Sequence, residues 1–270
     1  MSRLHLNGLD FNVELEGDPD APPLLLVHGF TGSLRSWDEL RPRLTRCARL
    51  IALDLIGHAD SAAPLDPARY SLDWAVRDLE ALLDMLELPS AHVFGYSMGG
   101  RLALYFALQA RARVRTLVLE SATPGIDDAE ERARRRQSDD ALAERIERLG
   151  VPAFVAEWEA QPLLRLAEHV TSSARTRVRD ERLRHTTRGL ANSLRGMGTG
   201  QQPPLWSRLA ELECPLTLIV GADDARYCAI ARRMQLMVPS ARLVVCAAAG
   251  HTVHVDQALA VAQQVCQALC

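Results

Sequence analysis

The 270-residue chain contains no lysine, so all 31 of its basic residues are arginines. A chain-wide absence of this kind points first to genomic base composition and only second to function. The formal net charge is −3, and the pI calculated from the sequence is about 6.2. A charge balance this close to neutral argues against nucleic-acid partners and against binding to anionic membranes.

Long apolar runs are also absent, since none approaches the ~18 residues of a transmembrane helix. Residues 1–16 alternate polar and apolar side chains and lack the apolar core of a signal peptide. No Cys-x-x-Cys pair occurs among the six cysteines, which are Cys47, Cys214, Cys228, Cys246, Cys266 and Cys270. We therefore predict reduced thiols, no metal site, no membrane insertion and a cytoplasmic location.

What is present is a pattern of buried strands alternating with amphipathic helices. The hydrophobic content of 48% suffices for one large α/β domain with an insertion. Residues 4–16 read as a hairpin around Asn7-Gly8. We predict further strands at residues 24–27, 50–53, 92–94, 114–120, 215–220 and 242–246, and helices at residues 37–44, 72–86, 101–110, 225–237 and 257–269. Such alternation is typical of a mostly parallel central sheet flanked by helices.

One segment interrupts this alternation. Residues 126–209 are rich in helix formers, crowded with arginine and without a strong strand pattern. We predict that residues 1–125 and 210–270 form the α/β core and that residues 126–209 form an inserted helical cap.

The most informative stretch is Gly95-Tyr96-Ser97-Met98-Gly99, which lies between a predicted strand and a predicted helix. A Gly-x-Ser-x-Gly sequence in this context is typical of a nucleophile elbow, where the chain leaves a strand, turns sharply and enters a helix. Glycines at both ends remove side chains that would collide across so tight a turn. We predict Ser97 as the nucleophile.

A serine hydroxyl needs a partner base and an orienting acid. The α/β-hydrolase fold supplies them in the chain order serine, acid, histidine. Here Asp223 and Asp224 follow one predicted strand, and His251 follows the last predicted strand. We predict the triad Ser97, Asp224 and His251, with Asp223 as a solvated turn residue and His254 as a packed or solvated histidine.

The turn after residues 24–27 reads His28-Gly29-Phe30. In this architecture one oxyanion-hole amide comes from such a turn and the other from the residue after the nucleophile. We therefore predict the backbone N–H groups of Phe30 and Met98 as the oxyanion hole. His28 is interpreted as a structural histidine that braces the turn.

These features predict an α/β-hydrolase fold with a serine triad, but they do not identify a substrate. Arg101 lies four residues after Ser97, one helical turn away. An arginine at that position suits a substrate that carries a carboxylate, because its guanidinium forms two parallel hydrogen bonds.

Four stretches resemble a known family. They are residues 95–101, 135–139, 158–163 and 189–206, the last of which contains Met-Gly-Thr-Gly-Gln-Gln-Pro at residues 197–203. The chain is similar, nearly end to end, to the 2-succinyl-6-hydroxy-2,4-cyclohexadiene-1-carboxylate synthases of menaquinone biosynthesis. The elbow alone is unspecific, whereas residues 197–203 lie in the cap, where relatives of hydrolases diverge most.

The resemblance implies a cofactor-free lyase that eliminates pyruvate from 2-succinyl-5-enolpyruvyl-6-hydroxy-3-cyclohexene-1-carboxylate, a small tricarboxylate. The triad serine would act as base toward a ring proton next to the succinyl carbonyl. The family's substrate-binding residues match Tyr96, Arg101, Arg135, Trp158 and Arg182 of this chain. Arg179 and Arg184 lie close to Arg182 in the sequence, so which of these three arginines faces the pocket stays open.

The chain departs from the family at one loop. The usual Pro-Gly-His-Gly-x-Ser reads Ile-Gly-His-Ala-Asp-Ser at residues 56–61, which should shift the loop locally.

Two alternatives remain open. One is a carboxylesterase or C–C bond hydrolase that uses the same triad, and the other is a non-catalytic ligand receptor on this fold. The sequence leaves the oligomeric state open and is compatible with a monomer.

Overall fold

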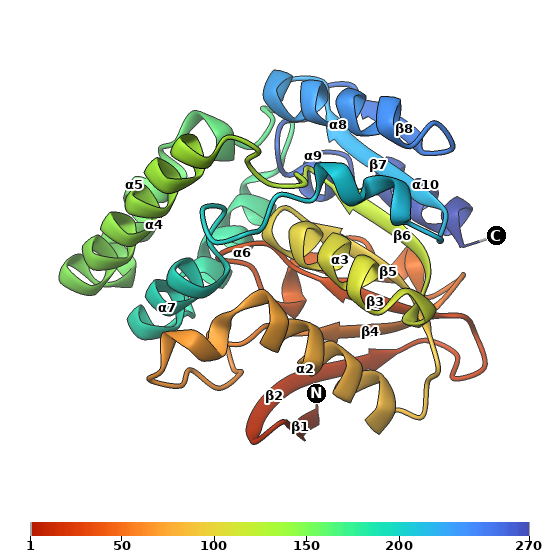
Figure 1. Ribbon diagram of the computed structural model, residues 1–270, viewed down its shortest axis with the longest axis horizontal. Helices are drawn as coiled ribbons and strands as arrows, with labels where there is room; N and C mark the ends of the chain where they lie inside the picture. Colours follow the sequence, from red (N-terminus) through yellow and green to blue (C-terminus); the bar gives the residue numbers. More distant parts are fainter. Residues whose placement is uncertain (1, 270) are drawn as a thin grey trace.

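An eight-stranded sheet forms the centre of the computed structural model, which describes residues 2–269 (Figure 1). The strands are β1 (Ser2–Leu6), β2 (Leu9–Glu16), β3 (Pro23–Val27), β4 (Arg49–Leu53), β5 (Ala91–Tyr96), β6 (Val114–Glu120), β7 (Leu216–Gly221) and β8 (Arg242–Cys246). Their order across the sheet is β1-β2-β4-β3-β5-β6-β7-β8. The pairings β1–β2 and β2–β4 are antiparallel and the others are parallel, so the predicted mostly parallel sheet is confirmed.

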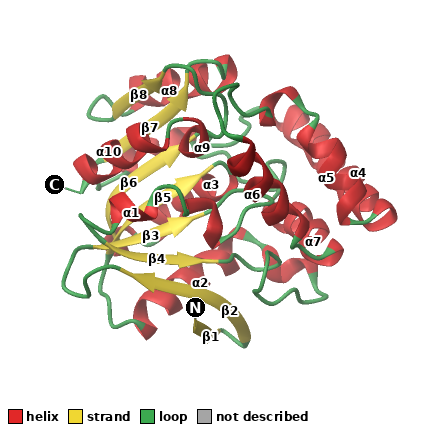
Figure 2. Cartoon of the chain, turned by 180° about the vertical axis from the view of Figure 1, so that it is seen from behind, coloured by secondary structure: helices red, strands yellow, loops and turns green. Residues whose placement is uncertain are grey.

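Helices cover both faces of the sheet, which is why central strands such as β3 and β5 are buried along their whole length. On one face lie α2 (Leu72–Met85), α3 (Met98–Gln109) and α8 (Ala225–Met237), with α2 and α3 in front of the sheet in Figure 1. On the other lie α1 (Arg41–Leu44), α9 (Val253–Asp256) and α10 (Ala258–Ala268) (Figure 2). None of the helices within residues 2–269 is both long and apolar enough to cross a membrane.

Two predicted helices are broken into shorter pieces. Residues 37–44 contain the end of the 3₁₀ helix η1 (Leu34–Trp37) and then α1, because Pro42 lies in the first turn of α1 and favours a new helix start. The predicted helix at 257–269 is preceded by the separate single turn α9. Further 3₁₀ turns are η2 (Pro67–Tyr70), η3 (Arg111–Arg113), η4 (Pro162–Leu164) and η5 (Trp206–Glu211).

Between β6 and β7 the chain forms helices α4 (Ala129–Leu149), α5 (Val151–Glu159), α6 (Ser172–Leu183) and α7 (Thr187–Met197). They lie together at one end of the sheet, beyond the carboxyl ends of the parallel strands (Figures 1 and 2). Three of them share a small apolar core that includes Ile146 of α4, Phe154 of α5 and Leu190 of α7. These helices fall within the segment predicted as the cap, whose limits at residues 126 and 209 stay a prediction.

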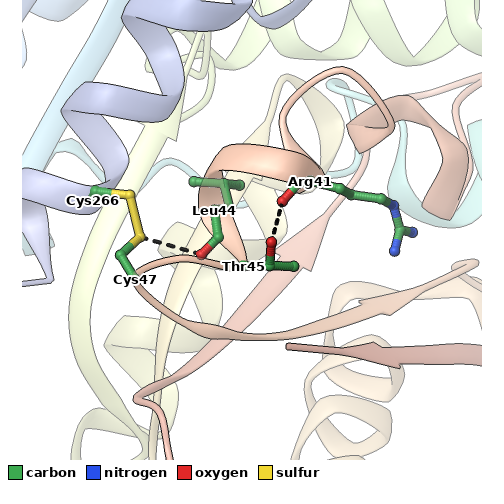
Figure 3. The surroundings of a disulfide bond; sticks show 5 residues. All are labelled: Arg41, Leu44, Thr45, Cys47 and Cys266. Atoms are coloured by element: carbon green, nitrogen blue, oxygen red, sulfur yellow. Dashed lines mark hydrogen bonds between the residues drawn. A yellow bond between two sulfur atoms is a disulfide. The ribbon is translucent and has the colours of Figure 1, made fainter. Parts of the chain in front are cut away.

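One pair of cysteines corrects the prediction of six reduced thiols. Cys47, just after α1, forms a disulfide with Cys266 of α10 (Figure 3). The two Cα atoms are 5.9 Å apart, within the range for a disulfide, because α1 and α10 pack side by side on the same face of the sheet. Cys214, Cys228 and Cys246 are free thiols, and Cys270 lies outside the described residues.

Candidate active site

The turn between β5 and α3 has the strained geometry of a nucleophile elbow. Ser97 has φ 51° and ψ −108°, a backbone conformation that a non-glycine residue rarely adopts. A Cβ atom on Gly99 would lie 2.1 Å from the carbonyl oxygen of Val27, and one on Gly95 would lie 2.5 Å from that of Gly99. Both glycines are therefore required by close backbone approach, as the sequence predicted.

Three strand ends bring the predicted triad together. Ser97 follows β5, Asp224 follows β7 and His251 follows β8. The Nδ1 atom of His251 lies 2.8 Å from Asp224 Oδ2, and its Nε2 atom lies 3.0 Å from Ser97 Oγ. A carboxylate can only accept, so Nδ1–H donates to Asp224 and Nε2 accepts from the Ser97 hydroxyl. His251 thus has the tautomer that a general base toward Ser97 requires.

The two neighbouring aspartates have different surroundings. Asp224 is buried, and its second carboxylate oxygen caps α8 by accepting from the backbone N–H of Tyr227. Asp223 is exposed in the turn before it. His254 is packed rather than solvated, because its Nδ1 atom and backbone N–H both donate to the buried carboxylate of Glu120.

The turn after β3 and the start of α3 present the predicted oxyanion-hole amides. The backbone N–H groups of Phe30 and Met98 donate to no acceptor within residues 2–269. Both residues line the cavity that contains Ser97. His28 fixes the first turn, since its Nδ1 donates to Gly29 O at 2.8 Å and its Nε2 accepts from Leu55 N at 2.9 Å. Burial lowers the pKa of His28 to about 4, so the ring is neutral and structural, as predicted.

A cavity of about 570 Å³ opens above Ser97. Core and cap both contribute walls, and most predicted site residues meet there. Those that line it are Phe30, Tyr96, Ser97, Met98, Arg101, Arg135, Trp158 and His251. The arrangement offers a hydrogen-bonded serine and histidine, two free amides and several guanidinium groups in one volume.

Arg101 is a buried cation without a carboxylate partner among the described residues. Its side chain donates to Met197 O at 2.8 Å and to Gln202 Oε1 at 3.4 Å, both from the end of the cap segment. Burial lowers the pKa of Arg101 to about 10, which still leaves the guanidinium charged at neutral pH. A buried guanidinium held only by neutral acceptors favours an anionic ligand.

Arg135 on α4 is oriented by the cap itself. Its Nε donates to Asp139 Oδ1 at 2.8 Å, one helical turn later, while Asp139 Oδ2 accepts from Gly200 N at 3.0 Å. A Cβ atom on Gly200 would lie 2.3 Å from the backbone nitrogen of Arg136. The glycine-containing stretch at residues 197–203 therefore packs directly against α4 and helps to set the position of Arg135.

Two of the predicted site residues, Trp158 and Tyr96, contribute aromatic rings to the cavity wall. Trp158 packs edge to face against Phe30 with ring centroids 5.4 Å apart, and its indole N–H is buried without an acceptor among the described residues. Tyr96 packs against the rings of His251 and His254, and its hydroxyl lies 3.0 Å from Thr252 Oγ1.

Of the triad, Asp224 lies outside the wall of this cavity, behind His251. Arg182 is the one predicted substrate-binding residue that does not line the cavity. It lies buried on α6, where its guanidinium pairs with Glu159 Oε1 at 3.2 Å. It lines a neighbouring cavity of about 410 Å³ instead, together with Glu181 and His254. Arg184, which the sequence could not separate from Arg182, pairs with Asp60 at the surface.

The loop that departs from the family pattern contains a strained alanine. Ala59 has φ 42°, in the left-handed region that glycine adopts without cost. Its backbone N–H donates to His185 Nδ1 at 3.0 Å, and His185 Nε2 donates to Thr31 O at 2.9 Å. The loop is therefore joined to the cap and to the oxyanion turn through His185.

The wall of the cavity also contains residues that the sequence did not single out, among them Arg145, Arg226 and Tyr227. Tyr227 packs against His251 with ring centroids 4.5 Å apart. Arg226 and Tyr227 directly follow Asp224, so their position after the triad acid was the available signal.

The sheet order, the elbow and the hydrogen-bonded serine, histidine and aspartate define an α/β hydrolase with a serine triad. A family model described as the alpha/beta hydrolase fold matches residues 22–258.

The individual relatives are more specific. A Bacillus subtilis protein, named provisionally as a 2-succinyl-6-hydroxy-2,4-cyclohexadiene-1-carboxylate synthase, is 45% identical over 93% of this chain and 91% of its own length. The synthase of that name from Klebsiella pneumoniae is 32% identical over 91% of this chain and 92% of its own. The structure of MenH from S. aureus has a TM-score of 0.90 at 31% identity, over 96% of this chain and 97% of that chain. The chain belongs to the 2-succinyl-6-hydroxy-2,4-cyclohexadiene-1-carboxylate synthase family of α/β hydrolases.

Proposed function

We propose that the chain eliminates pyruvate from 2-succinyl-5-enolpyruvyl-6-hydroxy-3-cyclohexene-1-carboxylate and releases 2-succinyl-6-hydroxy-2,4-cyclohexadiene-1-carboxylate in menaquinone biosynthesis. Full-length similarity to synthases of that name supports the reaction. The single structural observation that carries it is a buried Arg101 in the cavity of Ser97 that pairs with no carboxylate of residues 2–269. Cytoplasmic location remains part of the proposal.

The proposed mechanism starts at Ser97. His251 accepts the hydroxyl proton through Nε2, and Asp224 stabilises the resulting imidazolium through the hydrogen bond to Nδ1. Ser97 Oγ then takes the ring proton at C2, next to the succinyl carbonyl. The carbonyl oxygen gains negative charge and accepts hydrogen bonds from the amides of Phe30 and Met98, in the manner of an oxyanion hole.

The electrons of this enolate complete the elimination. They re-form the succinyl carbonyl and place a double bond between C2 and C3, the former C3–C4 double bond shifts to C4–C5, and the C5–O bond breaks. Enolpyruvate leaves and is protonated on carbon to give pyruvate. The proton taken from C2 balances this step, and the triad returns to its starting state without a cofactor.

The charges of the cavity fit the substrate's three carboxylates. We propose that Arg101 and Arg135 bind carboxylates and that Tyr96 and Trp158 pack against the ring. A contact from Arg182 stays a prediction, and it requires that the pair with Glu159 opens.

Ser97→Ala tests the proposal. The variant should lose several orders of magnitude in kcat for pyruvate release, because the oxygen that takes the ring proton is gone. Substrate affinity should change little, since Ser97 carries no charge. Retention of near wild-type turnover would exclude Ser97 as the base.

The same assay separates the alternatives. A burst of acyl-enzyme with an ester substrate, in the absence of pyruvate release, would indicate the carboxylesterase or C–C hydrolase instead. Absence of any turnover, with substrate binding intact, would indicate a non-catalytic receptor.

A further inference from the structure

The cavity above Ser97 contains more positive charge than the family resemblance accounted for. Four arginines line it, and they come from three different elements: Arg101 from α3, Arg135 and Arg145 from α4, and Arg226 from α8. Their partners separate them into two groups. Arg135 pairs with Asp139, and Arg145 pairs with Glu157 at 2.7 Å.

Neither arginine of the second group pairs with a carboxylate in the part of the chain that the structure describes. Arg101 is held by two neutral oxygens, from Met197 and Gln202. Arg226 forms neither a hydrogen bond nor an ion pair with any residue between positions 2 and 269, and its side chain is exposed. An exposed arginine without a partner is unremarkable on a convex surface, but this one borders the volume that contains the triad.

Tyr227, the next residue on α8, adds a neutral donor to the same cavity wall. Its ring packs on His251, and its backbone N–H is used by Asp224, so its position is tied to the triad. Tyr227 lines the cavity, and its hydroxyl has no hydrogen-bond partner among the described residues. Burial raises the pKa of Tyr227 against the lowering effect of Arg101, Arg226 and Arg135, so the hydroxyl stays protonated and can donate.

We propose that the Arg226 guanidinium and the Tyr227 hydroxyl form a carboxylate subsite on the α8 side of the cavity. The inference rests on the proposed function, because it assigns to this subsite one of the substrate's three carboxylates. Arg101 supplies only one unpaired guanidinium, whereas a tricarboxylate presents more than one anionic group. The shared first turn of α8 would then orient both the triad acid and the substrate.

Steady-state kinetics of pyruvate release tests the subsite. Arg226→Gln should raise KM about tenfold, as expected for a lost charge-assisted hydrogen bond, with kcat within about threefold. Arg226→Lys should recover part of the loss. Tyr227→Phe keeps the ring on His251 and should raise KM about threefold, as for a neutral hydrogen bond.

Arg232→Gln is the matched control. Arg232 is exposed on the same helix, lies outside the cavity wall and is also an arginine, so its KM should stay within about twofold of wild type. An unchanged KM in Arg226→Gln would overturn the proposal. An equal rise in Arg226→Gln and Arg232→Gln would also overturn it, because the effect would then come from net charge.

Succinate binding, measured by calorimetry, separates this inference from the proposed function. We expect Arg226→Gln to weaken succinate binding about tenfold relative to wild type and to Arg232→Gln. If wild type releases no pyruvate but binds succinate through Arg226, the reaction is wrong and the anion subsite stands. If succinate binds equally to wild type and Arg226→Gln, or to neither, the subsite is wrong whatever the reaction.

Discussion

Replacing Arg101 with methionine is the most direct test of charge recognition in the core. Methionine keeps an unbranched apolar stem and removes the guanidinium. Arg101 is only 7% exposed, so little solvent screening applies to the charge that is lost. The neighbouring guanidinium of Arg135 is bound to Asp139 and is poorly placed to substitute for it.

The expected magnitude follows from the hydrogen bonds that Arg101 would make. A charge-assisted hydrogen bond contributes about 1.5–3 kcal/mol. Because each 1.4 kcal/mol is a factor of ten, kcat/KM should fall about 10- to 150-fold. The variant also leaves Met197 O and Gln202 Oε1 without their donor, which should lower the free energy of unfolding by about 1–3 kcal/mol.

These two effects need separate measurements. Pyruvate release, coupled to lactate dehydrogenase, gives kcat/KM, while urea denaturation gives the free energy of unfolding. Arg101→Lys keeps the charge and loses the forked geometry, so its kcat/KM should fall between wild type and Arg101→Met. The argument would be refuted if stability dropped while kcat/KM stayed within about threefold of wild type, because Arg101 would then be purely structural.

Three further predictions concern the triad acid, the loop and the disulfide. Asp224→Asn should lower kcat about 10³- to 10⁴-fold and Asp223→Asn by less than about threefold in the same assay, and the reverse order would reassign the acid. Ala59→Gly should raise the free energy of unfolding by about 0.5–1 kcal/mol, because it relieves φ 42°; a decrease in urea denaturation would contradict this. Cys47→Ser should cost about 2–4 kcal/mol relative to the oxidised wild type, since the disulfide closes a loop of 219 residues. Equal denaturation curves of this variant and the oxidised wild type would disprove a structural role for the disulfide.

The elbow was predictable because the residues that form it are contiguous in the sequence. A Cβ atom on Gly95 would meet Gly99 within the elbow, whereas one on Gly99 would meet Val27 and His28 at the end of the neighbouring strand β3. The acid and the base were predictable for a related reason. Each follows a recognisable buried strand, and carboxyl ends of neighbouring parallel strands meet at one edge of a sheet.

The disulfide was not predictable, because no local signal links Cys47 to Cys266. Their contact arises because α1 and α10 cover the same face of the sheet, although the two cysteines are 219 residues apart in the sequence. The lack of an export signal led to the prediction of reduced thiols, which is wrong for Cys47 and Cys266. An export signal bears on the redox conditions of a compartment, whereas a disulfide also depends on the distance between two side chains.

The orientation of the cap arginines was equally hidden. The resemblance assigned Arg182 to the substrate, yet on α6 its side chain reaches Glu159 and a different cavity. Each further residue along a helix turns the side-chain direction by about 100°. An error of one residue in the expected helix position therefore changes which of several nearby arginines faces the pocket. Arg226 and Tyr227 were not predicted as site residues, because the sequence does not show that the first turn of α8 borders the cavity.

The core of the chain supplies the residues for proton transfer, and the cap helices supply much of the cavity that surrounds them. Ser97, Asp224 and His251 come from strand ends of the core, whose hydrogen bonds suit proton transfer for many substrates. Arg135 and Trp158 come from α4 and α5 and contribute charge and aromatic surface to the cavity, which we propose bind the substrate. Arg101 joins the two parts, since it begins on α3 beside the serine and donates to the end of α7. Substitution at Arg101 should thus affect both proton transfer and recognition, whereas substitution at Arg135 should act mainly on KM.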